Sequence, residues 1–497
     1  MSRVDAKGKV YLVGAGPGDM DLITWKGRLI LERADAVLYD HLTAHALLDL
    51  APAHAERIYV GKKKAVHSYS QDEICAMLID RARRGLQVVR LKGGDPFIFG
   101  RGGEEAEALA DAGVEFEIVP GVTTPLGIAA YTGVPLTHRE HTSVVTFVTG
   151  HDVAQIDWSR VGHAETLVLF MGLTNFGEIA RAIVEAGRDP STPAMAVRWA
   201  TRGDQRTVVA RLDELAAAIE REHLRPPATI IIGDVVKLRE KLNWFEKLPL
   251  FGRRIVVTRA REQSGEFASK LRSLGAEVIE LAAIEIRPAA DYAALDRAIG
   301  QLSTYDWLIF TSANGVRSFL ERLDHSQRDL RDVRARLCAI GPATRAALDR
   351  VHLKTDVIGK EYVAESLIDA LATHDLGGRR VLLARAAVAR DVLPNALRER
   401  GAAVDVVEAY RTAAPENLRG RATEIFGKSP KPDWVTFTSS STVTHLIAAA
   451  GAEALRGVRV ASIGPVTSAT ARKLGLEIAV EASTFNIDGL IAAIIRQ

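Results

Sequence analysis

Cysteine is scarce in this chain of 497 residues, which contains only Cys75 and Cys338. Two cysteines so far apart exclude a zinc cluster built on cysteine, and so low a content is typical of a reducing compartment. Charge of one sign is also lacking, because 64 basic and 62 acidic residues leave a formal net charge of +2. A nearly neutral chain without a basic tail gives no indication of a nucleic-acid partner.

Long apolar segments are missing as well. The longest uncharged run, residues 118–137, contains Pro120, Pro125 and Pro135 and is too interrupted for a transmembrane helix. The first nine residues lack the apolar stretch of a signal peptide. We therefore expect a cytoplasmic protein with no membrane partner.

The composition is that of a globular protein, with 47% hydrophobic and 25% charged residues. β-like runs alternate with helical stretches throughout, which predicts an α/β fold. Residues 242–252 fit neither period, and a new strand is expected at 254–258. We therefore expect an N-terminal domain over 1–245, a short packed linker over 246–252 and a C-terminal domain over 253–497.

The most informative segment is Arg90–Glu105, which holds five glycines. It follows a β-branched run at 87–91 and precedes an expected helix at 104–112. Only glycine lets a ligand approach the main chain without a Cβ in the way. Because open α/β sheets bind ligands where a strand passes into a helix, the segment predicts a binding loop.

A second glycine-rich turn, Gly14–Asp19, follows an expected strand at 10–13. It resembles a dinucleotide fingerprint, and Asp40 lies about 20 residues further on, as an NAD site requires. However, Asp19 occupies the place of the third glycine, and Pro17 removes an N–H that a pyrophosphate would use. The pattern therefore disfavours an NAD site.

Nine separated blocks of the first half occur in an order and spacing that resemble the uroporphyrinogen-III C-methyltransferases of the tetrapyrrole methylase family. The resemblance covers roughly residues 7–245. The blocks are Val13–Asp19, Tyr39–Asp40, Gly61–Lys62, Arg90–Glu105, Val119–Thr124, Gly133–Arg139, Val148–His151, Phe170–Gly172 and Pro227–Gly233.

This resemblance implies two α/β lobes, a homodimer through this half, and S-adenosyl-L-methionine in the cleft between the lobes, with S-adenosyl-L-homocysteine as product. That cofactor carries no phosphate, so it needs hydrogen-bond acceptors and backbone contacts. Ala200 stands where the family usually has glycine, and the sequence alone would favour core packing for Met171. The implied cofactor-binding residues are Gly14, Pro17, Gly93, Gly94, Asp95, Ile98, Thr123, Thr124, Met171 and Ala200.

The implied reaction transfers methyl groups to two pyrrole carbons of uroporphyrinogen III and gives precorrin-2. By position, Asp40 is the candidate base and Lys62 a candidate proton donor. Each has a plainer interpretation, as a solvated carboxylate at a strand end and as part of a solvated lysine run. Arg101 and Arg139 are candidate clamps for the substrate carboxylates, with Lys92 as a further possibility.

The second half repeats itself. Residues 254–259 resemble 380–385, residues 307–314 resemble 434–441, and residues 340–344 resemble 463–467. The three offsets, 126, 127 and 123 residues, nearly agree, which predicts one duplicated unit. Two similar lobes with hydroxyl-rich strand ends suggest a cleft between them.

Hydroxyl side chains follow two expected strands of this half. Such side chains can bind carboxylates without a fixed charge. Each alone is better explained as a helix N-cap, and only the two matched sets together favour a cleft. The four histidines of the region, His325, His352, His374 and His445, are scattered and are interpreted as structural. The candidate substrate-binding residues are Thr311, Ser312, Thr438, Ser439 and Ser440.

Four short motifs in residues 253–495 resemble uroporphyrinogen-III synthase: Thr311–Val316, Glu408–Thr412, Phe437–Ser440 and Ser462–Pro465. The resemblance implies a pair of flavodoxin-like lobes with exchanged segments, 253–287 plus 412–497 and 288–411. The chain departs from the family at Arg385–Arg390, where an arginine-glycine pattern is common. The implied reaction closes hydroxymethylbilane to uroporphyrinogen III, with Tyr410 as candidate proton donor or, alternatively, a structural tyrosine.

The product implied for the second half is the substrate implied for the first. We therefore predict a bifunctional enzyme that feeds sirohaem or cobalamin synthesis. Two alternatives stay open at this point. The methyltransferase can act on another substrate, such as another tetrapyrrole or a protein, or the second half can be a non-catalytic tetrapyrrole-binding module.

Overall fold

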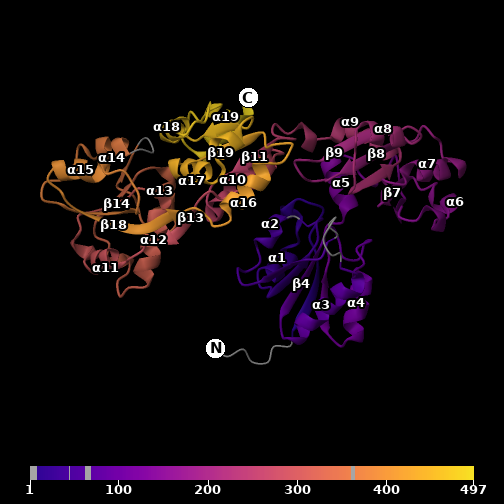
Figure 1. The fold of residues 1–497 in the computed structure, drawn as a ribbon, viewed down its shortest axis with the longest axis horizontal. Helices are drawn as coiled ribbons and strands as arrows, with labels where there is room; N and C mark the ends of the chain where they lie inside the picture. The colour runs from indigo at the N-terminus through magenta and orange to yellow at the C-terminus, as the bar shows by residue number, and fades with distance from the viewer. Residues whose placement is uncertain (1–7, 44, 62–68, 360–363) are drawn as a thin grey trace. The chain divides into compact units, whose positions relative to one another are not determined.

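The computed structural model describes residues 8–43, 45–61, 69–359 and 364–497, so Lys62 lies outside the described residues. The chain forms two compact units (Figure 1). The first comprises Met1–Arg253 with Ser273–Glu277, and the second comprises Arg254–Arg272 with Val278–Gln497. Strands and helices alternate in both, which confirms the predicted α/β class.

The N-terminal sheet of the first unit has the strand order β3-β2-β4-β1-β5, and every pair in it is parallel. Strand side chains alternate between the two faces, so Val10 and Leu12 pack with Leu78 while Val13 packs with Leu31 on the other face. The helices α1, α3 and α4 cover the two faces of this sheet (Figure 1). The bounds are β1 (Lys9–Gly14), α1 (Trp25–Leu31), β2 (Ala36–Tyr39), β3 (Glu56–Tyr59), α3 (Gln71–Arg83), β4 (Gln87–Lys92), α4 (Gly102–Asp111) and β5 (Glu115–Val119).

The second sheet of this unit has the order β6-β7-β10-β8-β9, in which only β6 and β7 pair in parallel. The helix α5 precedes this sheet, and α7 and α8 pack on it through Phe176, Ile179 and Leu215. The bounds are α5 (Thr124–Thr132), β6 (Val145–Thr149), β7 (Thr166–Phe170), α7 (Phe176–Glu185), β8 (Pro193–Arg198), β9 (Arg206–Arg211), α8 (Leu215–Arg221) and β10 (Ala228–Ile232). Residues 242–252 pack on this unit, burying Phe245 and Leu250.

One sheet of the second unit has the order β12-β11-β19-β20-β21. Numbered along the chain this is 2-1-3-4-5, the order of flavodoxin-like folds. The strand β11 pairs in parallel with β19, and β19 with β20, around a core that contains Val256, Val435 and Val460. The bounds are β11 (Arg254–Val257), α10 (Arg261–Ser273), β12 (Glu277–Glu280), β19 (Trp434–Phe437), α17 (Ser440–Ala450), β20 (Arg459–Ser462), α18 (Pro465–Lys473), β21 (Val480–Glu481) and α19 (Ile487–Ile495).

The other sheet of this unit has the order β13-β18-β17-β14-β15-β16, with β13 antiparallel at its edge. The five parallel strands lie in the same order as those of the other sheet of this unit, with β17 in the place of β11 and β14 in the place of β19. These are the strands that the internal sequence repeat aligns. The bounds are β13 (Glu285–Pro288), β14 (Trp307–Phe310), α12 (Ala313–Asp324), β15 (Arg336–Ala339), α13 (Pro342–Asp349), β16 (Val357–Ile358), β17 (Arg380–Ala386), α15 (Val392–Glu399) and β18 (Ala403–Ala413).

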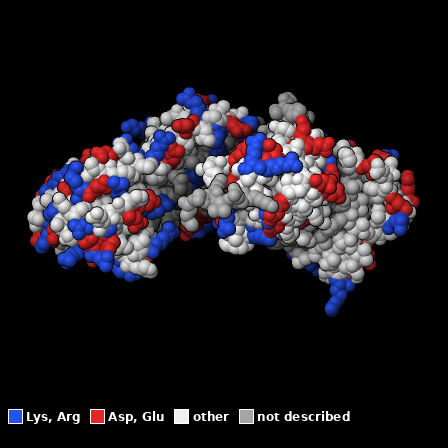
Figure 2. Space-filling view, turned by 90° about the horizontal axis from the view of Figure 1, so that it is seen from below, with Lys and Arg blue, Asp and Glu red and all other residues white. Residues whose placement is uncertain are grey.

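Charges of both signs are interspersed over the visible face of each unit (Figure 2), as expected from the nearly balanced composition. Within the described ranges, none of the helices combines the length and hydropathy needed to cross a bilayer.

Candidate functional site

A cavity of about 670 Å³ opens in the first unit at the carboxyl ends of β1, β2 and β4. A cavity of this size suits a small molecule or cofactor. Its walls come from both sheets of the unit, with Asp40 and Lys92 from the N-terminal sheet and Met171 and Ala200 from the second. Most of the predicted cofactor residues line it: Pro17, Gly93, Gly94, Asp95, Ile98, Thr123, Thr124, Met171 and Ala200.

Three backbone segments meet beneath this cavity without intervening side chains. Gly94 N–H donates to the carbonyl of Gly16 at 2.7 Å, and Gly16 N–H donates back to Gly94 at 3.2 Å. A Cβ on Gly121 would lie 2.3 Å from the Gly94 oxygen, and a Cβ on Gly14 would lie 2.5 Å from the Gly121 nitrogen. Gly14 is therefore a packing residue behind the cavity wall.

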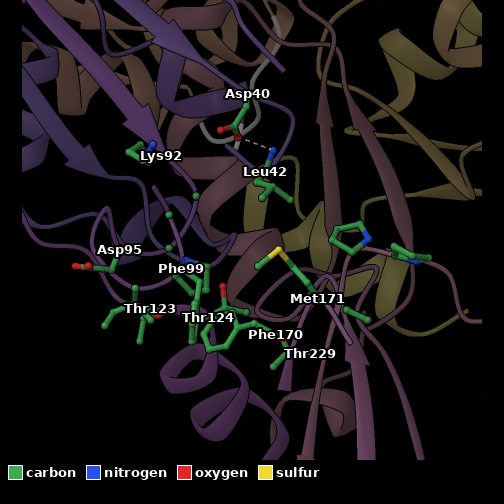
Figure 3. Close-up of a pocket in the computed structure, with 18 of the residues that line it drawn as sticks. Asp40, Leu42, Lys92, Asp95, Phe99, Thr123, Thr124, Phe170, Met171 and Thr229 are labelled. Carbon is green, nitrogen blue, oxygen red and sulfur yellow. Dashed lines mark hydrogen bonds between the residues drawn. The ribbon is translucent and has the colours of Figure 1, made fainter. Parts of the chain in front are cut away.

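Asp95 organises the same loop. Its Oδ1 accepts from Phe97 N–H at 2.8 Å and its Oδ2 accepts from Gly121 N–H at 3.0 Å. Each carboxylate oxygen retains a further lone pair for a ligand. Thr123 and Thr124 stand at the start of α5 on the opposite side of the cavity from Asp40 in the close-up (Figure 3).

Apolar side chains project into the cavity instead of into a core. Met171 is 55% exposed, and Ile98 and Phe99 are also exposed. Figure 3 shows the Met171 sulfur directed between Leu42 and Thr124. Core packing, the interpretation that the sequence alone favours for Met171, is thus wrong.

The backbone of these segments is strained. Phe99, Arg101 and Met171 have φ values of 50°, 59° and 53°, a region that residues with a Cβ rarely adopt. Such strain is concentrated at functional sites, where the surrounding structure holds it in place. Here it turns the Phe99 and Met171 side chains towards the cavity.

A buried network of charged side chains supports the wall that contains Asp40. Glu105 is fully buried, and its Oε1 accepts from Lys92 Nζ at 2.8 Å and from Arg90 Nε at 3.2 Å. Arg90 Nη2 in turn lies 3.3 Å from Asp40 Oδ2, and Asp40 Oδ1 accepts from Leu42 N–H at 3.0 Å. Asp40 is therefore held at both oxygens.

Lys92 is 4% exposed, and two opposing influences act on the pKa of its amine. Burial, and next the positive charge of Arg90, lowers the pKa of Lys92, whereas Glu105 acts in the opposite direction. Lys92 is thus a buried ion-pair partner at the cavity wall, with its amine committed to Glu105. The sequence interpretation missed Glu105, and its only signal was a glutamate pair at the start of the expected helix.

The two predicted arginine clamps are in different places. Arg101 lines the cavity and forms an exposed pair with Glu104, with Nη2 2.6 Å from Oε2. Arg139 is exposed in the segment after α5 and is not among the cavity-lining residues. The sequence interpretation also missed other residues that line the cavity, among them His41, His151, Phe170 and Trp199.

Tyr410 of the second unit lies on β18 and is 7% exposed. Its hydroxyl is 3.0 Å from Ser312 Oγ. Burial raises the pKa of Tyr410, while hydrogen bonds from Ser312 and Asn314 oppose that rise. The phenol is therefore kept protonated and can donate.

Two of the predicted hydroxyl residues of this unit, Ser312 and Ser439, cap helices. Ser312 Oγ accepts from Gly315 N–H at 3.0 Å, and Ser439 Oγ accepts from Thr442 N–H at 3.4 Å. Thr311 and Thr438 are half-buried at the strand ends before them. A second hollow of about 670 Å³ lies against α17 and α18. Ser440 does not line it but accepts a hydrogen bond of 2.8 Å from Thr470, which does.

Two family models match this chain. "Tetrapyrrole (Corrin/Porphyrin) Methylases" matches residues 9–216, and "Uroporphyrinogen-III synthase HemD" matches residues 265–492. The "Porphyrin biosynthesis protein HemD" of Ruminiclostridium josui is 36% identical over 97% of both chains. The siroheme synthase of Chromobacterium violaceum is 49% identical over 49% of this chain. The matched region covers 53% of that relative, so the chain spans about half of its length.

Among solved structures, the uroporphyrin-III C-methyl transferase of Thermus thermophilus in complex with S-adenyl homocysteine is 43% identical, with a TM-score of 0.42. The similarity covers 46% of this chain and 100% of that one. The full-length match and the two family models together show that this chain belongs to the tetrapyrrole biosynthesis proteins in which a tetrapyrrole methylase domain is fused to a uroporphyrinogen-III synthase domain.

Proposed function

We propose that the chain is a bifunctional enzyme with domains over 1–245 and 253–497, joined by 246–252. The second domain closes hydroxymethylbilane to uroporphyrinogen III, and the first methylates that product at two carbons to give precorrin-2. The observation that carries the proposal is the pairing of both domains in one chain with a 36% identical relative along its whole length. The product feeds sirohaem synthesis, cobalamin synthesis or both.

The cavity of the first unit fits S-adenosyl-L-methionine. Gly93 and Gly94 line it without side chains, and Asp95 has free lone pairs. Exposed Ile98 and Met171 offer an apolar surface to a purine ring and a thioether. When bound, this cofactor supplies the methyl group. The residues that would hold it are Pro17, Gly93, Gly94, Asp95, Ile98, Thr123, Thr124, Met171 and Ala200.

Asp40 is the proposed base that accepts the proton leaving the macrocycle. Arg90 and the Leu42 N–H fix its two oxygens, so it is oriented before substrate binds. Arg101 remains a candidate to bind a substrate carboxylate through a bidentate pair. Arg139 is proposed to bind a substrate carboxylate from the exposed segment after α5, outside the cavity wall. Lys62 is proposed as a proton donor by family position alone.

In the second unit, Tyr410 is the proposed proton donor to the departing hydroxyl of hydroxymethylbilane. Its buried phenol and its bond to Ser312 Oγ support this role. Thr311, Ser312, Thr438, Ser439 and Ser440 are proposed to contact substrate at the two strand ends. The protein is further proposed to be cytoplasmic and to form a homodimer through its first half.

The substitution Asp40→Asn tests the methyltransferase assignment. The amide can still accept from Leu42 N–H, so cofactor binding is expected to persist while methylation of supplied uroporphyrinogen III falls by about a hundredfold or more. Turnover is measured by mass analysis of the methylated product, and affinity by calorimetric titration with S-adenosyl-L-homocysteine. Full methylation by the variant would remove Asp40 from the mechanism.

A further inference from the structure

Two arginines of the second unit approach one another where its two lobes meet. Arg259 follows β11, and Arg317 lies on α12. Between them, Gln263 Nε2 of α10 donates to Asn314 Oδ1 of α12. Arg259 Nε donates to Gln263 Oε1 at 3.2 Å, and Arg317 Nη2 donates to Asn314 Oδ1. Four side chains from two lobes thus form a continuous polar row.

This row carries two positive charges held by neutral amides. Among the described residues, neither guanidinium has a carboxylate within ion-pair distance. Burial lowers the pKa of Arg259, Glu266 raises it, and the like charge of Arg317 lowers it further. Glu266 lies 3.1 Å from Lys270 and is therefore shared with another cation. An anion placed between the arginines would relieve their repulsion and satisfy their remaining N–H groups.

The helix α12, which carries Asn314 and Arg317, also begins beside the proposed proton donor. Ser312, two residues before Asn314, has its Oγ 3.0 Å from the Tyr410 hydroxyl. Asn314 and the charge of Arg317 both act to lower the pKa of the Tyr410 phenol, which places the row close to it. An anionic group bound by the two arginines would therefore lie next to Tyr410.

We propose that Arg259 and Arg317 form a carboxylate-binding site that anchors one acidic side chain of the linear tetrapyrrole while Tyr410 faces its reacting end. This inference rests on the proposed synthase function and adds the residues that hold the substrate. Arginine suits the role because its planar fork binds a carboxylate through two parallel hydrogen bonds. Gln263 and Asn314 act as positioning residues that fix the two forks across the lobe junction.

The test compares Arg259→Gln and Arg317→Gln with the control Arg331→Gln. Arg331 is exposed in the same unit and pairs with Asp329 at 2.6 Å, away from this row. Initial rates of uroporphyrinogen III formation are measured over a range of hydroxymethylbilane concentrations in the full chain. We expect KM to rise about tenfold or more in each row variant, with a smaller change in kcat, and no change in the control. Arg259→Lys keeps the charge and is expected to recover part of the affinity.

A binding measurement separates this inference from the synthase assignment. Uroporphyrin III, the oxidised and unreactive product, is titrated by fluorescence at several salt concentrations. The row variants are expected to bind it more weakly and with less salt dependence than the wild type. Unchanged KM and unchanged porphyrin affinity in folded variants would overturn the site. A lower Tm with unchanged affinity would mean that the row only stabilises the contact between the lobes, which also overturns the proposed site. If the wild type forms only the type I isomer, the synthase assignment fails while the porphyrin titration still decides the anion site.

Discussion

Glu105 is the residue on which the wall behind Asp40 depends. It is fully buried and pairs with both Lys92 and Arg90, whereas the adjacent Glu104 forms an exposed pair with Arg101. Removing one member of a buried ion pair leaves an uncompensated charge, which costs about 3–5 kcal/mol, whereas an exposed pair contributes at most about 1 kcal/mol.

We therefore predict that Glu105→Gln lowers the free energy of unfolding of the first unit by about 3–5 kcal/mol, because it leaves buried positive charge uncompensated. The matched variant Glu104→Gln should change it by no more than about 1 kcal/mol. Urea unfolding followed by circular dichroism measures both. Equal losses in the two variants would contradict the account of this network.

Tyr410 gives a prediction with a pH dependence. Burial raises the pKa of its phenol above the ordinary value of 10.0, so the protonated form that can donate persists to higher pH than for a free tyrosine. We predict that Tyr410→Phe slows ring closure by about a hundredfold. In the wild type, the contribution of Tyr410 should therefore be lost at a higher pH than the ionisation of a free tyrosine would give.

The measurement for Tyr410 is the pH profile of kcat for type III formation in both proteins. Tyr305→Phe is a suitable control, because this tyrosine is also buried but its hydroxyl donates to Asp405 at 2.7 Å, whereas that of Tyr410 bonds Ser312. Closure at the native rate by Tyr410→Phe would show that the tyrosine is structural.

At the scale of elements, the cavity floor is made by contact between three turns. A Cβ at Gly121 would lie 2.3 Å from the Gly94 oxygen and 2.7 Å from Gly14 Cα, so the turns would have to separate. We predict that Gly121→Ala weakens S-adenosyl-L-homocysteine binding by more than about tenfold and destabilises the unit by about 1–3 kcal/mol.

Gly103→Ala is the control for that substitution. Its Cβ would meet nothing within 4 Å, and alanine favours the helix α4 by up to about 1 kcal/mol. Calorimetric titration and urea unfolding compare the two variants. Normal cofactor affinity in Gly121→Ala would mean that the packing of these turns does not shape the cavity.

The elements around the site were largely predictable from local pattern. The expected strand at 87–91 is β4 (Gln87–Lys92), and the expected helix at 104–112 is α4, which begins earlier, at Gly102. The contact between Gly14 and Gly121 was not predictable, because it joins residues far apart in the chain. Glu105 was missed because burial of a charged side chain depends on partners that only the tertiary structure brings together.

The whole molecule joins two chemically consecutive domains. Within the second unit, the two sheets repeat one arrangement of parallel strands, and the residues that the sequence repeat aligns, such as Trp307 and Trp434, begin equivalent strands β14 and β19. The repeat could be predicted because it preserves strand sequences. The exchange that puts β13 into the sheet of β14 depends on pairing with β18, which no local pattern encodes.

The most direct test of the central claim is anaerobic incubation of the purified protein with hydroxymethylbilane, with and without S-adenosyl-L-methionine, followed by chromatography and mass analysis. We predict uroporphyrinogen III without the cofactor and its dimethylated product with it. Only the type I isomer, which forms spontaneously, in both reactions would contradict the claim that one chain performs both steps.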